Sequence, residues 1–262
     1  MSEDDNQLPS GLVALGTKAL GVRSAALVKR GLALAKSLQP DDAKDHYNLG
    51  VALFHQGDRN GAIAEFRAAI RLQTDDADAH FALGYTLRHE GEIDGAIAEL
   101  REALRLKPND DEVHVYLGLA LTSNGDKDGA MAEIHEALRL NPNSAYAHWA
   151  LGGRYMETGD TDGAVGQYRE ALRLDPDYVD AHHSLRRALR QKGDWDGVMA
   201  EARFALQVEP NDDWAHYDLG CACEHKHNLR EALQEYRTAY GLNPQDLRYR
   251  NAYERLAKET RQ

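Results

Sequence analysis

Cysteine and histidine gather in one short run of the sequence, CACEHKH at residues 221–227. Thiolate and imidazole are ligands that zinc and copper prefer, so this run is the first place to look for metal chemistry. On a helix, only residues three or four apart share a face. Cys221 and His225 therefore form one pair, whereas Cys223 and His227 form a second pair that points elsewhere. We accordingly expect no metal and no cofactor, and these four residues are the only candidates for a metal site.

Histidine also recurs at a fixed interval of 34 residues. The six positions are His46, His80, His114, His148, His182 and His216. Neighbouring helix pairs lie roughly 10 Å apart, which is too far for two such histidines to share an ion with bonds of about 2 Å. We interpret these residues as half-buried, hydrogen-bonded histidines with a structural role.

The same interval organises the rest of the chain. Leu-Gly recurs at residues 49–50, 83–84, 117–118, 151–152 and 219–220, and proline recurs at residues 108, 142, 176, 210 and 244. At the one position where the glycine is missing, the sequence has Arg186. Units of 34 residues begin at Pro9, Ala43, Ala77, Asp111, Ala145, Val179 and Asp213, and a tail follows from Leu247.

This pattern resembles the tetratricopeptide repeat (TPR). The unit that starts at Ala145 carries the family's residue types at Leu151, Gly152, Tyr155, Ala164, Tyr168, Ala171 and Pro176. The resemblance implies an all-α fold: a right-handed α-solenoid (superhelix) of seven helix-turn-helix repeats with a C-terminal capping helix. We expect a flexible N-terminus at 1–8, a divergent repeat at 9–42, six regular repeats at 43–246 and the capping helix at 247–262.

Small and polar residues predict the local geometry of each unit. Glycines 57, 91, 125, 159 and 193 are expected to close the first helix, because glycine adopts the left-handed conformation at little cost. The second helix is expected to be capped by Asn60, Asp94, Asp128, Asp162 and Asp196. The glycine of each Leu-Gly should face the small residue twelve positions later. Arg186 and Val198 break this rule together, so we expect looser packing in residues 179–212.

In the family that the pattern resembles, the first helices line a concave groove that binds partners. The groove positions carry Tyr47, Phe54, Phe81, Tyr85, Arg88, Tyr146, Trp149, Met156, Arg187, Arg190, Trp214 and Tyr217. Aromatic residues and arginine dominate the energetics of protein binding. The alternative is that some of these rings pack between neighbouring first helices. The Asn residues of the family's carboxylate clamp are absent, since residues 51, 85 and 119 are Val, Tyr and Leu.

Composition narrows the class of partner. The chain has 262 residues, 42% of them hydrophobic, and a net charge of −12. This charge argues against nucleic acid, which basic surfaces bind, and favours a neutral or basic protein or peptide. Two cysteines cannot form a disulfide framework, and the acidic start does not resemble a secretory signal. We therefore expect a cytoplasmic protein of bacterial origin.

These observations together favour a scaffold or adaptor protein that binds a peptide or protein in its groove and catalyses no reaction. The sequence contains no phosphate-binding glycine loop, nucleophile elbow or HExxH motif. One alternative is a membrane-surface or self-assembling platform. Residues 8–40 hold five Lys and Arg residues and no acid, so residues 9–42 are the expected site of self-association, with membrane contact less favoured.

Overall fold

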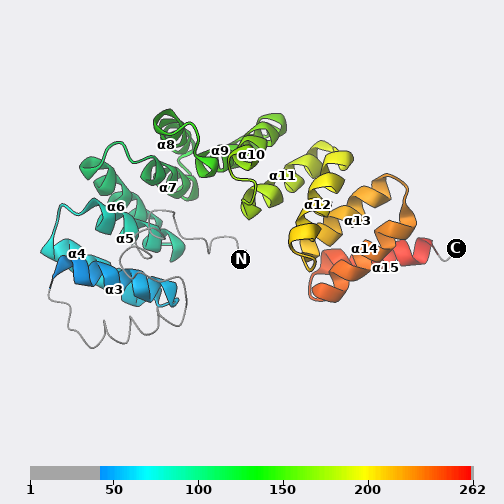
Figure 1. Ribbon diagram of the computed structural model, residues 1–262, viewed down its shortest axis with the longest axis horizontal. Helices are drawn as coiled ribbons and strands as arrows, with labels where there is room; N and C mark the ends of the chain where they lie inside the picture. Colours follow the sequence, from blue (N-terminus) through cyan, green and yellow to red (C-terminus); the bar gives the residue numbers. More distant parts are fainter. Residues whose placement is uncertain (1–41, 261–262) are drawn as a thin grey trace. The chain divides into compact units, whose positions relative to one another are not determined.

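The computed structural model describes residues 42–260. Within this range the chain forms thirteen α-helices and no strand, which confirms the all-α class (Figure 1). Their bounds are α3 Ala43–His55, α4 Arg59–Leu72, α5 Ala77–His89, α6 Ile93–Leu106, α7 Asp111–Ser123, α8 Lys127–Leu140, α9 Ala145–Thr158, α10 Thr161–Leu174, α11 Val179–Lys192, α12 Trp195–Val208, α13 Asp213–His225, α14 Leu229–Leu242 and α15 Leu247–Glu259. No helix in this range is long and apolar enough to cross a membrane. The N-terminal segment at 1–8 and the divergent repeat at 9–42 lie outside the described residues, except for Asp42.

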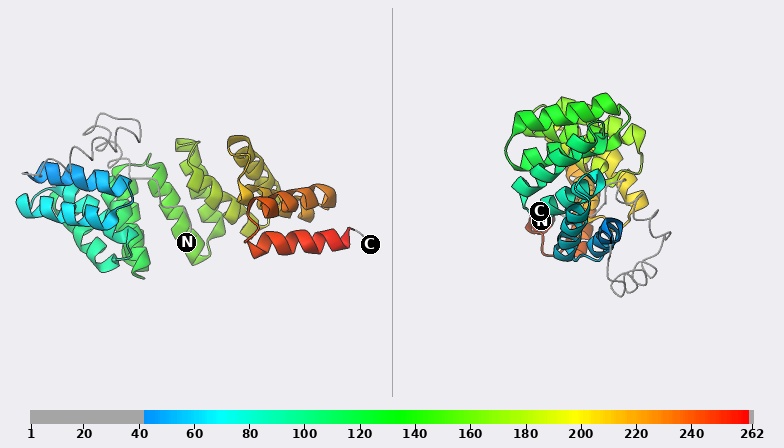
Figure 2. Two further views of the ribbon diagram at one scale, coloured as in Figure 1. Left: turned by 90° about the horizontal axis from the view of Figure 1, so that it is seen from below. Right: turned by 90° about the vertical axis from the view of Figure 1, so that its left-hand side faces the viewer.

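The chain divides into two compact units, Met1–Ala150 and Leu151–Gln262, with the boundary inside α9. In the first unit, α3 packs on α4, α5 on α6 and α7 on α8, and each pair packs on the next. In the second unit, the helices from α10 to α15 likewise pack on one another in chain order. Figure 2 shows these antiparallel neighbours from two further directions. Each unit is therefore a row of helix pairs, which is the arrangement of an α-solenoid. We call α3, α5, α7, α9, α11 and α13 the first helices, and α4, α6, α8, α10, α12 and α14 the second helices.

Aspartate side chains begin most of the helices. Three first helices are preceded by Asp42, Asp110 or Asp212. The carboxylate of each accepts a hydrogen bond from the backbone amide three residues later, at 2.8, 3.2 and 2.9 Å respectively. Before four second helices, a glycine amide donates at 2.9 Å to Asp58, Asp126, Asp160 or Asp194. These bonds satisfy amides that have no partner inside the helix.

The predicted second-helix caps were therefore wrong by two residues. The glycine with positive φ, such as Gly57 at 83°, is followed at once by the capping residue Asp58. The turn between the two helices is thus shorter than the sequence suggested. Asp94, Asp128, Asp162 and Asp196 lie in the first helical turn instead, where a negative charge favours the helix dipole.

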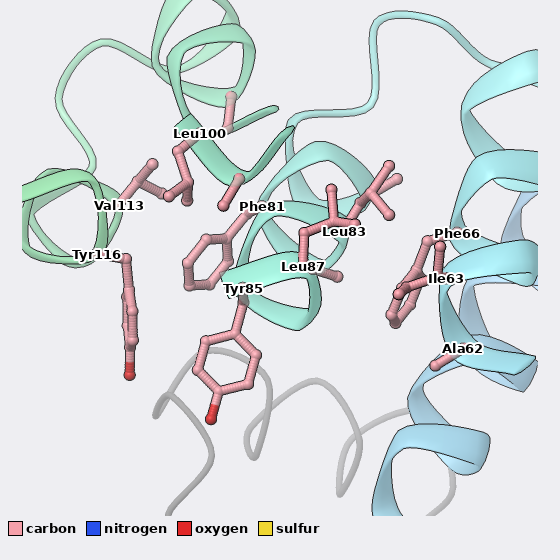
Figure 3. Packing of buried hydrophobic residues seen from close by; sticks show 14 of the residues in the cluster. Ala62, Ile63, Phe66, Phe81, Leu83, Tyr85, Leu87, Leu100, Val113 and Tyr116 are labelled. Carbon is pink, nitrogen blue, oxygen red and sulfur yellow. The ribbon is translucent and has the colours of Figure 1, made fainter. Parts of the chain in front are cut away.

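A close contact between the two helices of a pair explains the Leu-Gly repeat. A Cβ atom on Gly118 would lie 2.9 Å from Cγ1 of Ile134 and 3.1 Å from the carbonyl oxygen of Ala130. Gly84 is equally confined, by the side chain of Leu100 and the carbonyl oxygen of Ala96. Figure 3 shows Leu100 within this core. The glycine therefore faces the alanine that we predicted, but the nearest side chain is the large one sixteen positions after the glycine.

In the α11–α12 pair, the large residue lies on the first helix and the small residue lies on the second helix. Five other pairs combine the glycine with Phe66, Leu100, Ile134, Tyr168 or Tyr236. Here the glycine is replaced by Arg186, and the large residue is replaced by Ala202, which is fully buried. Arg186 is only 1% exposed. We infer that its side chain occupies the space that an apolar side chain fills in the other pairs, which would make Ala202, more than Val198, the compensating change.

The last helix, α15, covers the end of the second unit. Tyr249 and Leu256 are fully buried, and α15 packs on α14. Arg250, Glu254 and Lys258 are exposed on the opposite side. The helix thus has one apolar face and one charged face, as a capping helix requires.

Candidate functional site

Aromatic rings from four first helices form a continuous row in the first unit. Phe54 of α3 lies 5.4 Å from Tyr85 of α5, Tyr85 lies 5.2 Å from Tyr116 of α7, and Tyr116 lies 5.2 Å from Tyr146 of α9, measured between ring centroids. Trp149 stacks on Tyr146 at 5.5 Å. Aromatic pairs attract one another at such separations. We call these five residues the ring row; Figure 3 shows Tyr85 and Tyr116 side by side.

The predicted groove residues of this unit differ in how accessible they are. Tyr47, Phe81 and Tyr85 are buried, so these three rings pack between helices, as the alternative interpretation allowed. Phe54, Arg88, Tyr146 and Trp149 are half-buried. The guanidinium of Arg88 lies over the ring of Tyr116 at 6.0 Å from the centroid. The buried rings therefore pack beneath a surface that the half-buried residues present to solvent.

Tyr116 is a site residue that the sequence analysis missed. It occupies the sixth position of its unit, it was not among the twelve predicted groove residues, and it is buried. It nevertheless contacts Phe81, Tyr85 and Tyr146 and so joins the rings of three first helices. Its aromatic side chain, at a place where the neighbouring units have Ala82 and Ala150, was the signal that could have identified it.

In the second unit the predicted residues are grouped around α13. Tyr217 lies 5.1 Å from Tyr249 of α15, and Arg190 of α11 lies over its ring at 5.8 Å. The guanidinium of Arg248 lies over Trp214 at 4.1 Å from the ring centroid. Met156 is half-buried on α9, and Arg187 is exposed on α11.

Of the two predicted groove arginines of this unit, Arg187 and Arg190, one forms an ion pair. Nη1 of Arg190 donates to the buried carboxylate of Asp218 at 2.9 Å, and Nε of Arg186 lies 3.4 Å from the same carboxylate. Burial raises the pKa of Asp218, while the two arginines oppose that shift. Burial also raises the pKa of Tyr217 to about 12. Because Arg190 is paired, Arg187 is the predicted cation that stays exposed.

Recurring histidines join four of the helix pairs to the loop before them. In His114, Nδ1 lies 2.6 Å from a carboxylate oxygen of Glu133 and Nε2 lies 3.1 Å from the carbonyl oxygen of Pro108. The same two contacts occur at His80, His182 and His216. Both partners accept hydrogen bonds, which suits the doubly protonated ring. The bond to Glu133 raises the pKa of His114. The structural role that we predicted is confirmed.

The four candidate metal ligands do not converge. Cys223 is fully buried in an apolar cluster, and His225 stacks on Trp195 at 3.8 Å. His227 lies beyond the end of α13 with a φ of 59°. Burial raises the pKa of both thiols, that of Cys223 to about 11, whereas metals bind the thiolate. Among the described residues, no group of three or more His, Cys, Asp or Glu side chains is placed to hold a metal ion.

Successive helix pairs with one internal period define a helical repeat protein. Sequence models of the tetratricopeptide repeat match residues 23–73, 47–111, 87–153 and 215–246, and a TPR repeat model matches residues 152–185. These matches span most of the chain. The chain therefore belongs to the tetratricopeptide repeat family, as the sequence pattern predicted.

Several solved structures share the fold. A chain in the APC/C hetero-tetramer Cut9–Hcn1 aligns with a TM-score of 0.77 and 17% identity over 94% of this chain, which spans only 48% of that one. Pseudomonas aeruginosa pilF aligns at 0.70 and 19% identity, over 84% of this chain and 97% of that one. YrrB, described as a TPR protein with an unusual peptide-binding site, aligns at 0.58 and 20% identity, over 72% and 97%. At these identities the likeness concerns the fold. No curated protein matches the chain.

Proposed function

We propose that this protein is a non-catalytic scaffold that binds a peptide or a protein segment on its first helices. The ring row is the single observation that carries the proposal. Its rings come from four successive first helices and hold one another in place through aromatic contacts. A rigid aromatic surface loses little conformational entropy on binding, and aromatic residues are frequent energetic centres of interfaces.

The accessible members of this surface suit an extended or helical segment with apolar side chains. Phe54, Tyr146 and Trp149 supply half-buried apolar area, and Arg88 adds a cation beside it. In the second unit, Trp214 and Tyr217 supply a further aromatic group, and Arg187 supplies an exposed cation. The net charge of −12 favours a partner that is neutral or basic as a whole.

Two of the similar structures are consistent with this class of function. YrrB is described as having a peptide-binding site, and Cut9 is part of a hetero-tetramer with Hcn1. The proposal takes from them only the class of partner, a protein or peptide. Cytoplasmic location remains a prediction from the sequence, and so does the absence of enzyme activity.

The experiment is affinity capture from the native lysate with a paired variant and a matched control. Trp149→Ala with Arg187→Glu alters the proposed surface. Trp195→Ala with Arg169→Glu makes the same chemical changes on α12 and α10, which are second helices. We expect the first variant to lose the captured protein and the second to keep it, with far-UV circular dichroism unchanged in both. Capture that survives the first variant would place the site elsewhere.

A further inference from the structure

The exposed side of the α11–α12 pair differs from that of the three pairs before it. In α6, α8 and α10, a glutamate accepts a hydrogen bond at 2.7 Å from Nη2 of an arginine three residues later; these pairs are Glu102–Arg105, Glu136–Arg139 and Glu170–Arg173. The corresponding residues of α12 are Phe204 and Gln207. The residues that form an exposed ion pair in those helices are thus replaced by an exposed aromatic ring and an amide, and an exposed apolar group is unfavourable for solubility.

This exposed ring borders an open cavity of about 180 Å³ between α11, α12 and the start of α13. Three apolar side chains at the cavity are largely exposed: Val179 at 45%, Phe204 at 39% and Val208 at 68%. The ring of Phe204 stacks on His182 with centroids 4.7 Å apart, so its position is fixed. The cavity therefore has a preformed apolar wall that solvent reaches.

Acidic groups surround this apolar wall. Asp177 and Glu209 line the cavity, are exposed, and form no ion pair within the described part of the chain. The two basic side chains of the lining that form ion pairs each have a carboxylate partner: Nη2 of the buried Arg186 lies 3.2 Å from Asp212, and Nδ1 of His182 lies 2.7 Å from Glu201. The accessible charge at the mouth is therefore negative, which favours a cationic neighbour and opposes an anion.

We propose that this cavity binds a single large apolar side chain of a partner segment that carries lysine or arginine beside it. A cavity of about 150 Å³ is large enough for benzene, so the volume here suits one phenyl or leucyl group. The flanking cations of the partner would lie against Asp177 and Glu209. None of the twelve predicted groove residues lines this cavity, so it is a second site, separate from the surface of the proposed function.

Three short peptides test the proposal by NMR on the full chain: N-acetyl-Lys-Phe-Lys-amide, N-acetyl-Glu-Phe-Glu-amide and N-acetyl-Lys-Ala-Lys-amide. We expect only the first peptide to shift the backbone amide signals of Ala205 and Val208 in a saturable way. Phe204→Ser should weaken its binding about tenfold, the effect of removing roughly one buried aromatic contact. Leu242→Ser is the matched control, because Leu242 is also 39% exposed on a second helix, and it should leave binding unchanged.

Each other outcome overturns the proposal. Equal or tighter binding of the Glu-Phe-Glu peptide would show that Arg186 makes the cavity an anion site. Equal binding of the Lys-Ala-Lys peptide would show that only surface charge is involved, and no binding of any peptide would show that the cavity takes no side chain. Trp149→Ala with Arg187→Glu should still bind Lys-Phe-Lys, which separates this test from that of the proposed function.

Discussion

The reversed packing at Arg186 predicts a specific and large coupling between two substitutions. Arg186→Gly restores the glycine of the other pairs, and Ala202→Phe restores the large side chain that faces it. Phe66, in the α3–α4 pair, is the precedent, since it lies against Gly50 and is 1% exposed. Together the two changes should convert the α11–α12 pair to the packing of its neighbours.

The expected magnitudes follow from burial. Arg186→Gly empties the space of a side chain that is 1% exposed and removes one of the two arginines beside Asp218, while Arg190 remains at 2.9 Å. Large-to-small changes in a core cost about 2–5 kcal/mol, and loss of a buried ionic partner costs a similar amount, so we expect a loss of about 3–4 kcal/mol. Ala202→Phe alone would overfill the core beside Arg186 and should cost about 1–3 kcal/mol.

The free energy of unfolding lost by the double variant should be smaller than the two single losses added together, by at least about 2 kcal/mol. A coupling of this size is typical of residues in contact. Urea denaturation of all four proteins, followed by circular dichroism and by tryptophan fluorescence, measures it. Trp195 and Trp214 report on α12 and α13. If the loss of the double variant equals or exceeds the two single losses added together, the inference that Arg186 occupies the space of the missing apolar side chain is refuted.

Two further predictions concern stability. The pKa values of His114 and His216 are raised in the fold, mainly by hydrogen bonds to Glu133 and Glu235. The stabilisation that these histidines provide is therefore complete below the unfolded pKa of about 6.5. It is lost as pH rises through the folded pKa. The melting temperature should therefore fall as pH rises from about 6 to about 8, and Glu133→Gln with Glu235→Gln should reduce that slope; an unchanged slope would contradict the role given to these pairs. On α9, Gly152→Ala should destabilise by about 1–3 kcal/mol because its Cβ would lie 2.6 Å from the ring of Tyr168, whereas Gly153→Ala meets nothing within 4 Å and should stabilise by up to about 1 kcal/mol, as calorimetry would show. Equal effects of the two alanines would contradict the contact.

Local features of the fold were predictable from the sequence because each depends on a few neighbouring residues. Glycines such as Gly57 and Gly193 adopt positive φ at the end of first helices, as expected. The hydrogen bonds of the recurring histidines were also expected, because these residues lie at a position that packs between the helices. The period places them without any knowledge of the tertiary structure.

Features that depend on side-chain reach were not predictable in the same way. The sequence marked Arg186 and Val198 as irregular, whereas the residue that we infer to compensate is Ala202, which the spacing alone does not connect to Arg186. Likewise, the pattern could not separate the buried ring of Tyr85 from the half-buried ring of Trp149. A first helix packs against both its own second helix and its neighbours, so apolar periodicity does not tell which aromatic side chain remains accessible.

The most direct measurement of the central claim is site-specific photo-crosslinking during capture from the native lysate. A benzophenone amino acid would replace Trp149 in the ring row or, as the control, Arg139, which is exposed on the second helix α8. The proposed function predicts that a bound protein is crosslinked from position 149 and not from position 139. Crosslinking from position 139 with none from position 149 would contradict binding on the first helices.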